Sequence, residues 1–423
     1  MSRKWFKTLL FGLLIGISVG ARVAYIIKQE SYHSHRPAEM ERAAENIARE
    51  GTIARIFSDD SGYSAHVCPL YPYFLGGIYR VFGWNTASGK LVQELCAIAI
   101  TTLGFVLLPI LAKRTGLSAE AGWLAAFILA VMPLSLWIET SGSWEQPYAA
   151  FALMVLMLCF QKLADTEWTS PRLIVLTGLL CGIIGLLTPI ALPAGALIIL
   201  SQFISGKSYR SRIVVGTCLI GLVAAATLAP WTIRNYRVFG VIVPFRSNFG
   251  LELFLGNNPL SNSMPLNDPP NEAIRNLHPF NNSDELEKLK SVGEIAYMTG
   301  KKNEAVSWMS SHPAQVLQLT MYRFRNFWFP GRDIWPPDSS MRGLKSFVYT
   351  AFSVLAFLQL GWMSIKNGRQ ASLYAAVLFG PTISYMITHI DMRYRYPTIA
   401  ICALLSCQFI VSVVRLSYTR LKS

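Results

Sequence analysis

Long apolar segments alternate with shorter polar ones along this chain. The first apolar run covers residues 5–27, and a run of about 20 apolar residues is long enough to cross a bilayer as a helix. Nine more apolar segments follow, at residues 91–111, 119–138, 148–160, 173–187, 190–203, 213–230, 347–365, 373–387 and 399–414. The pattern predicts an all-helical integral membrane protein with about ten transmembrane helices. Residues 173–203 are the least regular part, because Pro189 and Pro193 interrupt a run too long for one helix and barely long enough for two.

Basic residues give the expected orientation of these helices. Lys and Arg occur in every second loop, at residues 113–114, 162–172, 207–212 and 366–369, and in the tail from residue 415. Cytoplasmic loops carry such an excess, so we expect both termini inside the cell. The expected units are the first helix (1–27), a first external loop (28–90), helices two to seven (91–230), a large external loop (231–345), and the last three helices with a cytoplasmic tail (346–423).

Composition narrows the class of protein. The chain is 52% hydrophobic and 15% charged, which lies well outside the composition of soluble domains. The net charge of +14 could indicate a nucleic-acid partner, but no basic run is interleaved with aromatic residues, so we expect membrane lipid and lipid phosphate instead. Six of the seven cysteines lie in apolar segments and only Cys68 in an external loop. A disulfide framework is therefore not expected.

The two external loops hold most of the polar chemistry. In the first, a polar helix beginning near Pro37 carries Glu39 and Glu41, and residues 70–75 are aromatic and apolar, as in a membrane-interface helix. In the second, residues 235–259 mix β-branched and aromatic residues with Gly and Asn, which predicts loop or short strand. Helices are predicted at residues 283–297, 303–310 and 313–327.

Four regions of the chain carry a resemblance to a known superfamily. They are ENIAREG with AHVCPLYPYFLGGIYRVFG, then IETSGSWEQPYAAF, then APWTIRNYRVFGVIVPFRS leading to LFLGNNP, and finally MRYRYP before the last helix. Together they resemble the membrane glycosyltransferases of the GT-C superfamily, above all the bacterial protein mannosyltransferases and aminoarabinose transferases. The resemblance implies a sugar donor carried on polyprenyl phosphate and inverting transfer at the outer face of a bacterial cytoplasmic membrane. The acceptor stays open between a glycan, a lipid and a protein.

Such a transfer needs a base for the acceptor hydroxyl. The resemblance implies an acidic residue, often Asp, early in the first external loop, and Glu39 is the best match, with Glu41 as its competitor. In the alternative interpretation these acids form a solvated helix face that pairs with Arg42 and Arg49.

The departing phosphate needs cations opposite its developing charge. Arg234 and Arg237 follow one predicted span, and Arg393 and Arg395 precede the last one, so both pairs would lie at the level of the outer headgroups. Headgroup contact by snorkelling is the alternative for each pair. We favour Arg393 and Arg395, because a basic cluster in a very short outer loop runs against the positive-inside trend.

The acceptor and sugar side has weaker candidates. Glu145 begins a predicted span from the outer side and could orient an acceptor, although an acid at a helix N-terminus also complements the helix dipole. Asn257 and Asn258 could bind sugar hydroxyls, but Asn-Asn-Pro is also an ordinary turn.

Metal ligation has the weakest signal in the sequence. His33, His35, His66 and His278 all fall in external loops, and their spacing matches no compact zinc pattern. We therefore expect scattered surface histidines and no metal site. The resemblance keeps a divalent ion possible, because some relatives hold a metal through a Glu and a His in these loops and others need one for catalysis.

Two rival functions come from other classes of protein. A transporter or flippase of lipid-linked sugars would carry ionisable residues near mid-membrane or paired broken helices in repeated halves, whereas the apolar segments here are nearly free of charge. A GT-C-like scaffold that has lost catalysis is the other rival.

Overall fold

The protein is helical throughout the described part of the chain. A computed structural model describes residues 3–34, 38–262, 272–335 and 341–422. Within these ranges there is no strand, and the only β-type pairing is an isolated antiparallel bridge between Ala54 and Tyr63. The predicted all-helical class is confirmed, and the short strands expected within residues 235–259 do not form.

Six described helices are long and apolar enough to cross a membrane. They are α1 (Arg3–Gln29), α4 (Ala87–Arg114), α7 (Gln146–Asp165), α10 (Arg210–Phe239), α16 (Arg342–Lys366) and α19 (Tyr396–Lys422). A seventh span results if α5 (Ala119–Val131) and the helical residues Pro133–Glu139, which include α6 (Leu136–Glu139), count as one segment bent by 56°. Every apolar segment of the sequence is helical, but the prediction of ten spans is not confirmed.

The remaining apolar segments form helices too short to qualify. They are α8 (Pro171–Leu187), α9 (Leu192–Ser205), α17 (Gly368–Phe379) and α18 (Thr382–Ile387). Proline accounts for two of the interruptions: Pro189 separates α8 from α9, and Pro381 separates α17 from α18.

The break after α5 leaves backbone carbonyl groups that need hydrogen-bond donors from elsewhere in the bundle. Pro133 has no N–H for the carbonyls of the preceding turn, and the Arg22 guanidinium donates to the carbonyl oxygens of Leu129 and Ala130 at 3.4 and 3.1 Å. Arg22 also pairs with Glu139 at 2.6 Å. A buried arginine of α1 therefore takes the place of the missing backbone donors.

Helix α10 continues past the predicted end of its span. Pro230 lies inside the helix, which reaches Phe239 before Gly240 ends it with φ 70°. A proline interior to a membrane helix is tolerated where neighbouring groups satisfy the freed carbonyl. Part of the segment expected to be loop or strand is thus the last turns of α10, and a further part is α11 (Phe249–Gly256).

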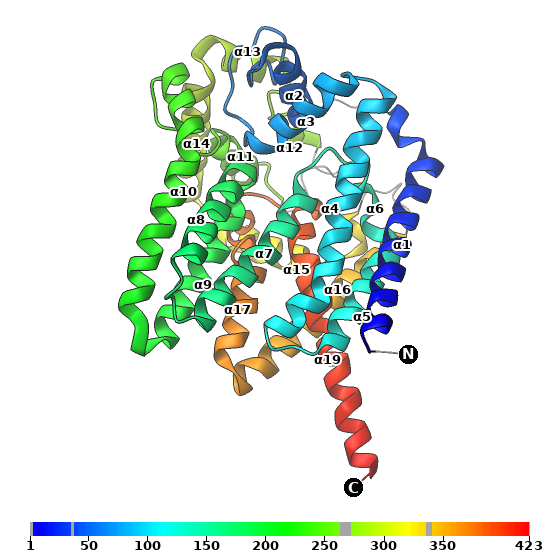
Figure 1. The fold of residues 1–423 in the computed structure, drawn as a ribbon. Helices are drawn as coiled ribbons and strands as arrows, with labels where there is room; N and C mark the ends of the chain where they lie inside the picture. The colour runs from blue at the N-terminus through cyan, green and yellow to red at the C-terminus, as the bar shows by residue number, and fades with distance from the viewer. Residues whose placement is uncertain (1–2, 35–37, 263–271, 336–340, 423) are drawn as a thin grey trace.

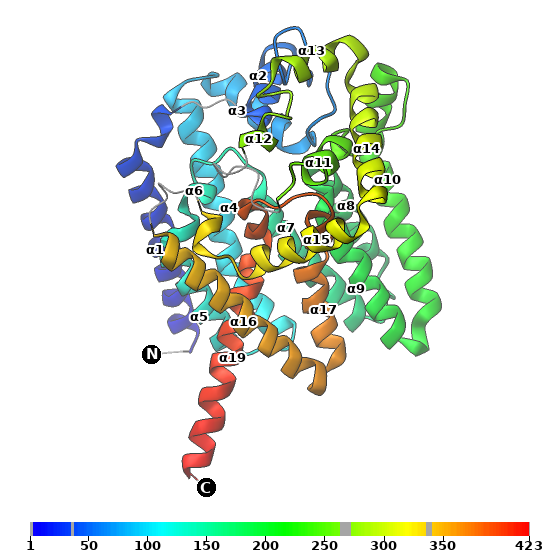
Figure 2. The same ribbon diagram turned by 180° about the vertical axis from the view of Figure 1, so that it is seen from behind.

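The helices of the two loops predicted to be external gather into one layer at the end of the bundle opposite both termini (Figures 1 and 2). This layer, called the cap below, contains α2 (Glu39–Glu50), α3 (Leu70–Phe82), α11, α12 (Glu272–Arg275), α13 (Ser283–Val292) and the upper part of α14 (Glu294–Ser311). From there α15 (Pro313–Trp328) crosses the face of the bundle seen in Figure 2. The first two helices predicted in the second loop are separated at Gly293, with φ 84°, and not between residues 297 and 303 as expected.

The two external loops share one hydrophobic core. Ala44 and Leu75 of the first loop are fully buried in the same cluster as Leu251 and Leu289 of the second. Helices α2 and α3 pack so closely that a Cβ on Gly76 would lie 2.6 Å from the Ile47 side chain. The cap is therefore a single packed unit made from two distant parts of the sequence.

Candidate functional site

Two neighbouring cavities lie where the cap meets the bundle. The larger, called the central cavity below, has a volume of about 710 Å³ and is lined from both sides, by residues that include Tyr25, Gln29, Ser31, Glu39, Lys90, Trp137, Ser143, Trp144, Glu252, Arg275, His278, Asn281, Arg393 and Tyr394. The smaller, called the lateral cavity below, has about 280 Å³ and is lined by residues that include Pro189, Ile190, Phe245, Arg246, Phe249, Glu252, Tyr385, His389 and Tyr394. Glu252 and Tyr394 line both cavities.

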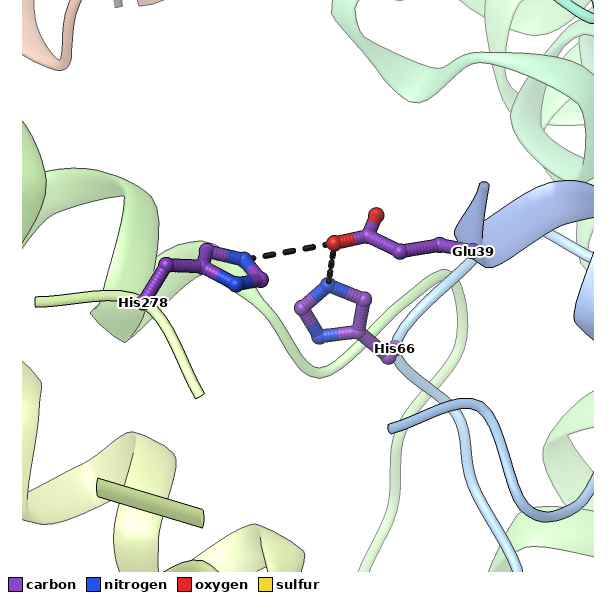
Figure 3. A group of neighbouring side chains, drawn as sticks. All are labelled: Glu39, His66 and His278. Atoms are coloured by element: carbon purple, nitrogen blue, oxygen red, sulfur yellow. Dashed lines mark ion pairs between the residues drawn. The ribbon is translucent and has the colours of Figure 1, made fainter. Parts of the chain in front are cut away.

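Glu39 is the centre of a three-residue cluster on the wall of the central cavity. It is the first residue of α2, and its Oε1 lies 3.4 Å from His66 Nε2 and 3.2 Å from His278 Nε2. Figure 3 shows each ring aiming one nitrogen at the same carboxylate oxygen. His66 precedes α3 and His278 follows α12, so the cluster joins the two external loops.

The cluster has an asymmetric charge balance. Burial alone would raise the pKa of Glu39, but the charges of His66 and His278 and the interaction with the His66 ring lower it to about 2. Burial would lower the pKa of His66, and the Glu39 carboxylate instead raises it. For His278 burial prevails over Glu39 and the pKa falls. Glu39 is thus held as an anion, chiefly by His66.

Two imidazoles and one carboxylate form a donor set that zinc accepts. The three possible ligand atoms all lie within 4.8 Å of one another. Both ring nitrogens of His66 are buried and have no hydrogen-bond partner in the described part of the chain. His278 differs, because its Nδ1 accepts from the Phe280 N–H. In a neutral ring this puts the proton on Nε2, so ligation through Nε2 would require that contact to be exchanged. With that one change, the cluster fits a divalent ion.

The expectation of scattered surface histidines is wrong for this pair. His66 is 1% exposed, and its separation from His278 by more than 200 residues gives no spacing pattern to detect. His33 is exposed, as expected, and His35 lies outside the described residues.

Glu294 and Arg234 hold the segment that carries His66. Glu294, the first residue of α14, accepts from Ser64 Oγ, from the Ala65 N–H at 2.8 Å and from Ser247 Oγ at 2.6 Å. Arg234 donates to the carbonyl oxygen of Ser64 at 2.9 Å and to that of Ile53 at 2.7 Å. Arg234 therefore binds backbone and lines neither cavity.

Glu41 faces a different partner from Glu39. It is 4% exposed and lies 3.1 Å from Lys90 Nζ, and Ser143 Oγ donates to the same carboxylate oxygen. Lys90 and Ser143 line the central cavity. Residues two apart on an α-helix point about 200° apart, which explains why only one of the two acids joins the histidine cluster.

The four arginines predicted to bind phosphate also differ in their surroundings, although they occur as two closely spaced pairs. Arg393 lines the central cavity, with its guanidinium 3.7 Å above the Trp144 ring. Its Nη2 donates to Tyr394 Oη at 3.4 Å, and its Nε lies 3.9 Å from Asp391 Oδ2 and has no hydrogen-bond partner among the described residues. Arg395 is fully buried and donates to Phe327, Trp328 and Tyr349 carbonyl oxygens. Arg237 is exposed on α10 and lines neither cavity. Of the four, the structure brings only Arg393 to the cavities.

The three residues predicted to bind the acceptor or the sugar differ in their contacts. Glu145 is 8% exposed at the start of α7, has Oε2 without a hydrogen-bond partner, and is close enough to interact with the charges of Arg246 and Arg393. Asn257 donates to the carbonyl oxygens of Leu253 and Ile387. Asn258 donates to Phe254 and Leu255 and accepts from the Leu260 N–H. Both amides are thus engaged with backbone, and neither lines a cavity.

Sequence reasoning missed Arg246, Glu252 and His389. Arg246 lines the lateral cavity and makes no hydrogen bond or ion pair with any described residue. Glu252 and His389 form an ion pair of 2.5 Å between α11 and the segment before α19. Arg246 could have been found as an unaccompanied cation in an apolar stretch, VIVPFRSNF. Nothing in the local sequence connects Glu252 with His389.

No model of a protein family matches the sequence, and no curated protein matches it. Solved structures do share its fold. Oligosaccharyltransferase AglB from Archaeoglobus fulgidus, in complex with an inhibitory peptide and a dolichol-phosphate, superposes with a TM-score of 0.58 at 14% identity, over 99% of this chain and 52% of that one. The A. fulgidus enzyme in complex with Zn and sulfate gives 0.57 at 14% identity, over 97% and 50%. The form tethered to an acceptor peptide containing the NVT sequon gives 0.57 at 13% identity over the same shares.

The chain spans about half the length of these oligosaccharyltransferases. At such low identity the likeness shows the fold alone, and it agrees with the resemblance to GT-C glycosyltransferases noted in the sequence. Several apolar helices and membrane-protein neighbours agree on a multi-pass membrane protein.

Proposed function

We propose that this protein is a membrane glycosyltransferase of GT-C type that moves a sugar from a polyprenyl-phosphate carrier to an acceptor, with inversion at the anomeric carbon. The observation that carries the proposal is Glu39, which faces a polar cavity of about 710 Å³ between bundle and cap in a fold shared with oligosaccharyltransferases. The dolichol-phosphate and the acceptor peptide bound to those neighbours support a lipid-linked donor and a separate acceptor.

Glu39 has two possible roles in this reaction. As a base it would take the acceptor proton through Oε2, since Oε1 faces both histidines. As a ligand it would hold a divalent ion together with His66 and His278, and such an ion supplies a Lewis acid for phosphate oxygens when bound. A pKa of about 2 for Glu39 favours the second role, because an effective general base has a pKa near the working pH.

Arg393 is the proposed donor-phosphate ligand in the central cavity. Its guanidinium is stacked on Trp144, which fixes the plane of the group and leaves its edge for a phosphate oxygen. Lys90 lies on the same cavity wall, paired with Glu41. Glu145 is proposed to balance the charge of the arginines when no anion is bound.

We place the reaction at the outer face of a bacterial cytoplasmic membrane, with both termini in the cytoplasm. The basic loops support this orientation, and both termini lie at the end of the bundle opposite the cap (Figure 1). The five-unit division of the chain is kept in this proposal, with residues 28–90 and 231–345 supplying the cap.

Transfer of radiolabelled sugar from a panel of synthetic polyprenyl-phosphate sugars into membrane extracts tests the proposal. We expect label transfer by the purified wild-type protein and its loss in Glu39→Gln. Glu45→Gln is the matched control, because Glu45 lies on the same helix and pairs with Arg49 at 2.8 Å; it should transfer normally. Wild-type protein that binds these donors and transfers nothing to any envelope acceptor would overturn the proposal.

A chelator separates the two roles of Glu39. Transfer that is lost with chelation and restored by Zn²⁺ or Mn²⁺ assigns Glu39 to metal binding. Transfer that persists after chelation assigns it to direct contact with the substrates.

A buried ion pair joins the apolar helices α1 and α6, where a transporter could hold its cargo, but its contacts do not favour that function. Arg22 and Glu139 are 0% and 3% exposed, and Tyr396 Oη also donates to Glu139 at 3.0 Å. These groups satisfy a helix break, and a carrier site would instead keep ionisable groups available to cargo.

A further inference from the structure

His389 is buried beside the lateral cavity with one ring nitrogen occupied and the other free. Its Nε2 lies 2.5 Å from Glu252 Oε2, whereas Nδ1 is buried and has no hydrogen-bond partner among the described residues. His389 is 5% exposed and lines the lateral cavity. A neutral imidazole that donates through Nε2 keeps its lone pair on Nδ1. The free nitrogen is therefore a proton acceptor on a ring that lines the lateral cavity.

Glu252 orients this ring and is not itself free to accept a proton. Its Oε1 accepts from Asn248 Nδ2 at 2.7 Å, and its Oε2 is taken by His389. Burial would raise the pKa of Glu252, but the hydrogen bond from His389 and the positive charge of Arg246 hold it well below the usual range. An ionised carboxylate that fixes the tautomer of an adjacent imidazole is the arrangement by which proteins prepare a histidine base.

The backbone that carries His389 is clamped against α11. Arg323 donates to the carbonyl oxygen of Ile387 at 3.1 Å, and Asn257 Nδ2 donates to the same oxygen at 2.8 Å. Gly256 permits the close approach, because a Cβ there would lie 1.8 Å from the Thr388 carbonyl oxygen. The distance between the ring and Glu252 is thus set by packing before any substrate arrives. Asn257, predicted as a sugar ligand, is in this arrangement a positioning residue.

A cation lines the same small cavity. Arg246 has no hydrogen-bond or ion-pair partner among the described residues, and Glu252 and Tyr394 connect this space with the central cavity. A proton acceptor and an unpaired guanidinium thus occur together in about 280 Å³.

The geometry points to His389, oriented by Glu252, as the base that takes the proton of the acceptor hydroxyl. This inference rests on the proposed function and deepens it. The acceptor O–H bond breaks as its proton moves to Nδ1, and the oxygen forms a new bond to the anomeric carbon. The bond from that carbon to the phosphate oxygen breaks, and its electron pair stays on the lipid phosphate, whose charge Arg246 stabilises. Glu39 is then left to hold the histidine cluster, with or without an ion.

Chemical rescue tests this role in the full-length protein. Transfer by His389→Ala should fall about 100-fold and recover in part when imidazole is added, because the added ring fits the space left by the side chain. Binding of the donor should be unchanged. His389→Gln should show the same loss with the melting temperature of the wild type. Glu252→Gln should lower transfer by about 10-fold, and imidazole should not relieve that loss.

His312→Ala is the matched control, because His312 is exposed at the end of α14 and is stacked on Trp308. It should transfer within about two-fold of the wild type, as surface substitutions generally do. Transfer by either His389 variant at the wild-type rate without imidazole would overturn the inference, and so would a loss that imidazole relieves in neither variant. A wild type inactive with every donor would overturn the proposed function and this inference together, whereas losses confined to the variants bear on His389 alone.

Discussion

Five arginines that are buried or half-buried fall into two groups that sequence position does not separate. Arg22, Arg323 and Arg395 donate to carbonyl oxygens in the last turns of α5, α18 and α15 respectively. Arg246 and Arg393 line cavities, and neither donates to a carbonyl oxygen of the described residues. Arg393 contacts only the side chains of Tyr394 at 3.4 Å and Asp391 at 3.9 Å there, besides its stacking on Trp144. The first group therefore holds broken and crossing helices together, and the second is available to an anion.

The difference between the two groups indicates when an arginine near a membrane surface binds backbone carbonyl groups and when it remains available to a ligand. A helix that ends inside the protein leaves carbonyl groups without donors, and the nearest guanidinium, with five donors, supplies them. An arginine with no helix end within reach keeps its donors for a ligand. The following four substitutions test this distinction, from the largest expected effect to the smallest.

Arg395→Leu should cause the largest loss. It would leave the carbonyl oxygen of Phe327 without its donor and would remove one donor each from Trp328 and Tyr349, which keep Ser353 Oγ. Each such lost contact of a buried group costs about 1–3 kcal/mol. We expect the free energy of unfolding to fall by about 3 kcal/mol or more, measured by thermal melting in detergent. Arg395→Lys keeps a cation but has fewer donors, so its free energy of unfolding should lie between those of the wild type and Arg395→Leu. An unchanged melting temperature in Arg395→Leu would contradict the capping role.

Arg246→Gln should leave the melting temperature unchanged and lower transfer by about 100-fold, because a donor aimed at the developing phosphate charge is lost. The measurement is initial transfer rate at saturating donor. Arg246→Lys should retain part of the rate, since a point charge remains. A variant that melts early with normal transfer would move Arg246 into the first group.

Arg234→Gln should have an intermediate effect, on stability and on metal binding. It removes two hydrogen bonds to the backbone around His66, so we expect about 1–2 kcal/mol of lost stability. If the Glu39 cluster binds zinc, its affinity should fall about 10-fold, as for other residues that hold metal ligands in place. Isothermal titration with Zn²⁺ and thermal melting measure the two effects. Affinity equal to wild type would show that the cluster does not depend on this clamp.

Arg237→Gln should have the smallest effect. The residue is exposed, three positions along α10 from Arg234, and lines neither cavity. Stability should stay within about 0.5 kcal/mol, and donor binding should match wild type. Weakened donor binding would restore Arg237 as a phosphate ligand.

Much of the fold follows from the sequence, because apolar segments become helices wherever they occur. The site follows only in part. The sequence suggests the same role for both members of two closely spaced pairs, Arg393 with Arg395 and Glu39 with Glu41. Residues two apart on a helical turn nevertheless point to different sides. Helix geometry alone could have separated them. The joining of Glu39 with His278, and of Glu252 with His389, depends on tertiary packing across more than a hundred residues and has no counterpart in local sequence.

The cap of two distant segments also determines when the candidate site can first assemble during synthesis of the chain. Glu39 and His66 leave the ribosome early, whereas Arg246, His278 and His389 follow only after α4 to α10 have been made. Their packing must wait for that insertion, since contacts distant in sequence form late. A nascent chain interrupted before α11 would carry the first half of the cap with its apolar face uncovered. Such a fragment would lack half of the candidate site and would expose apolar surface that the complete protein buries.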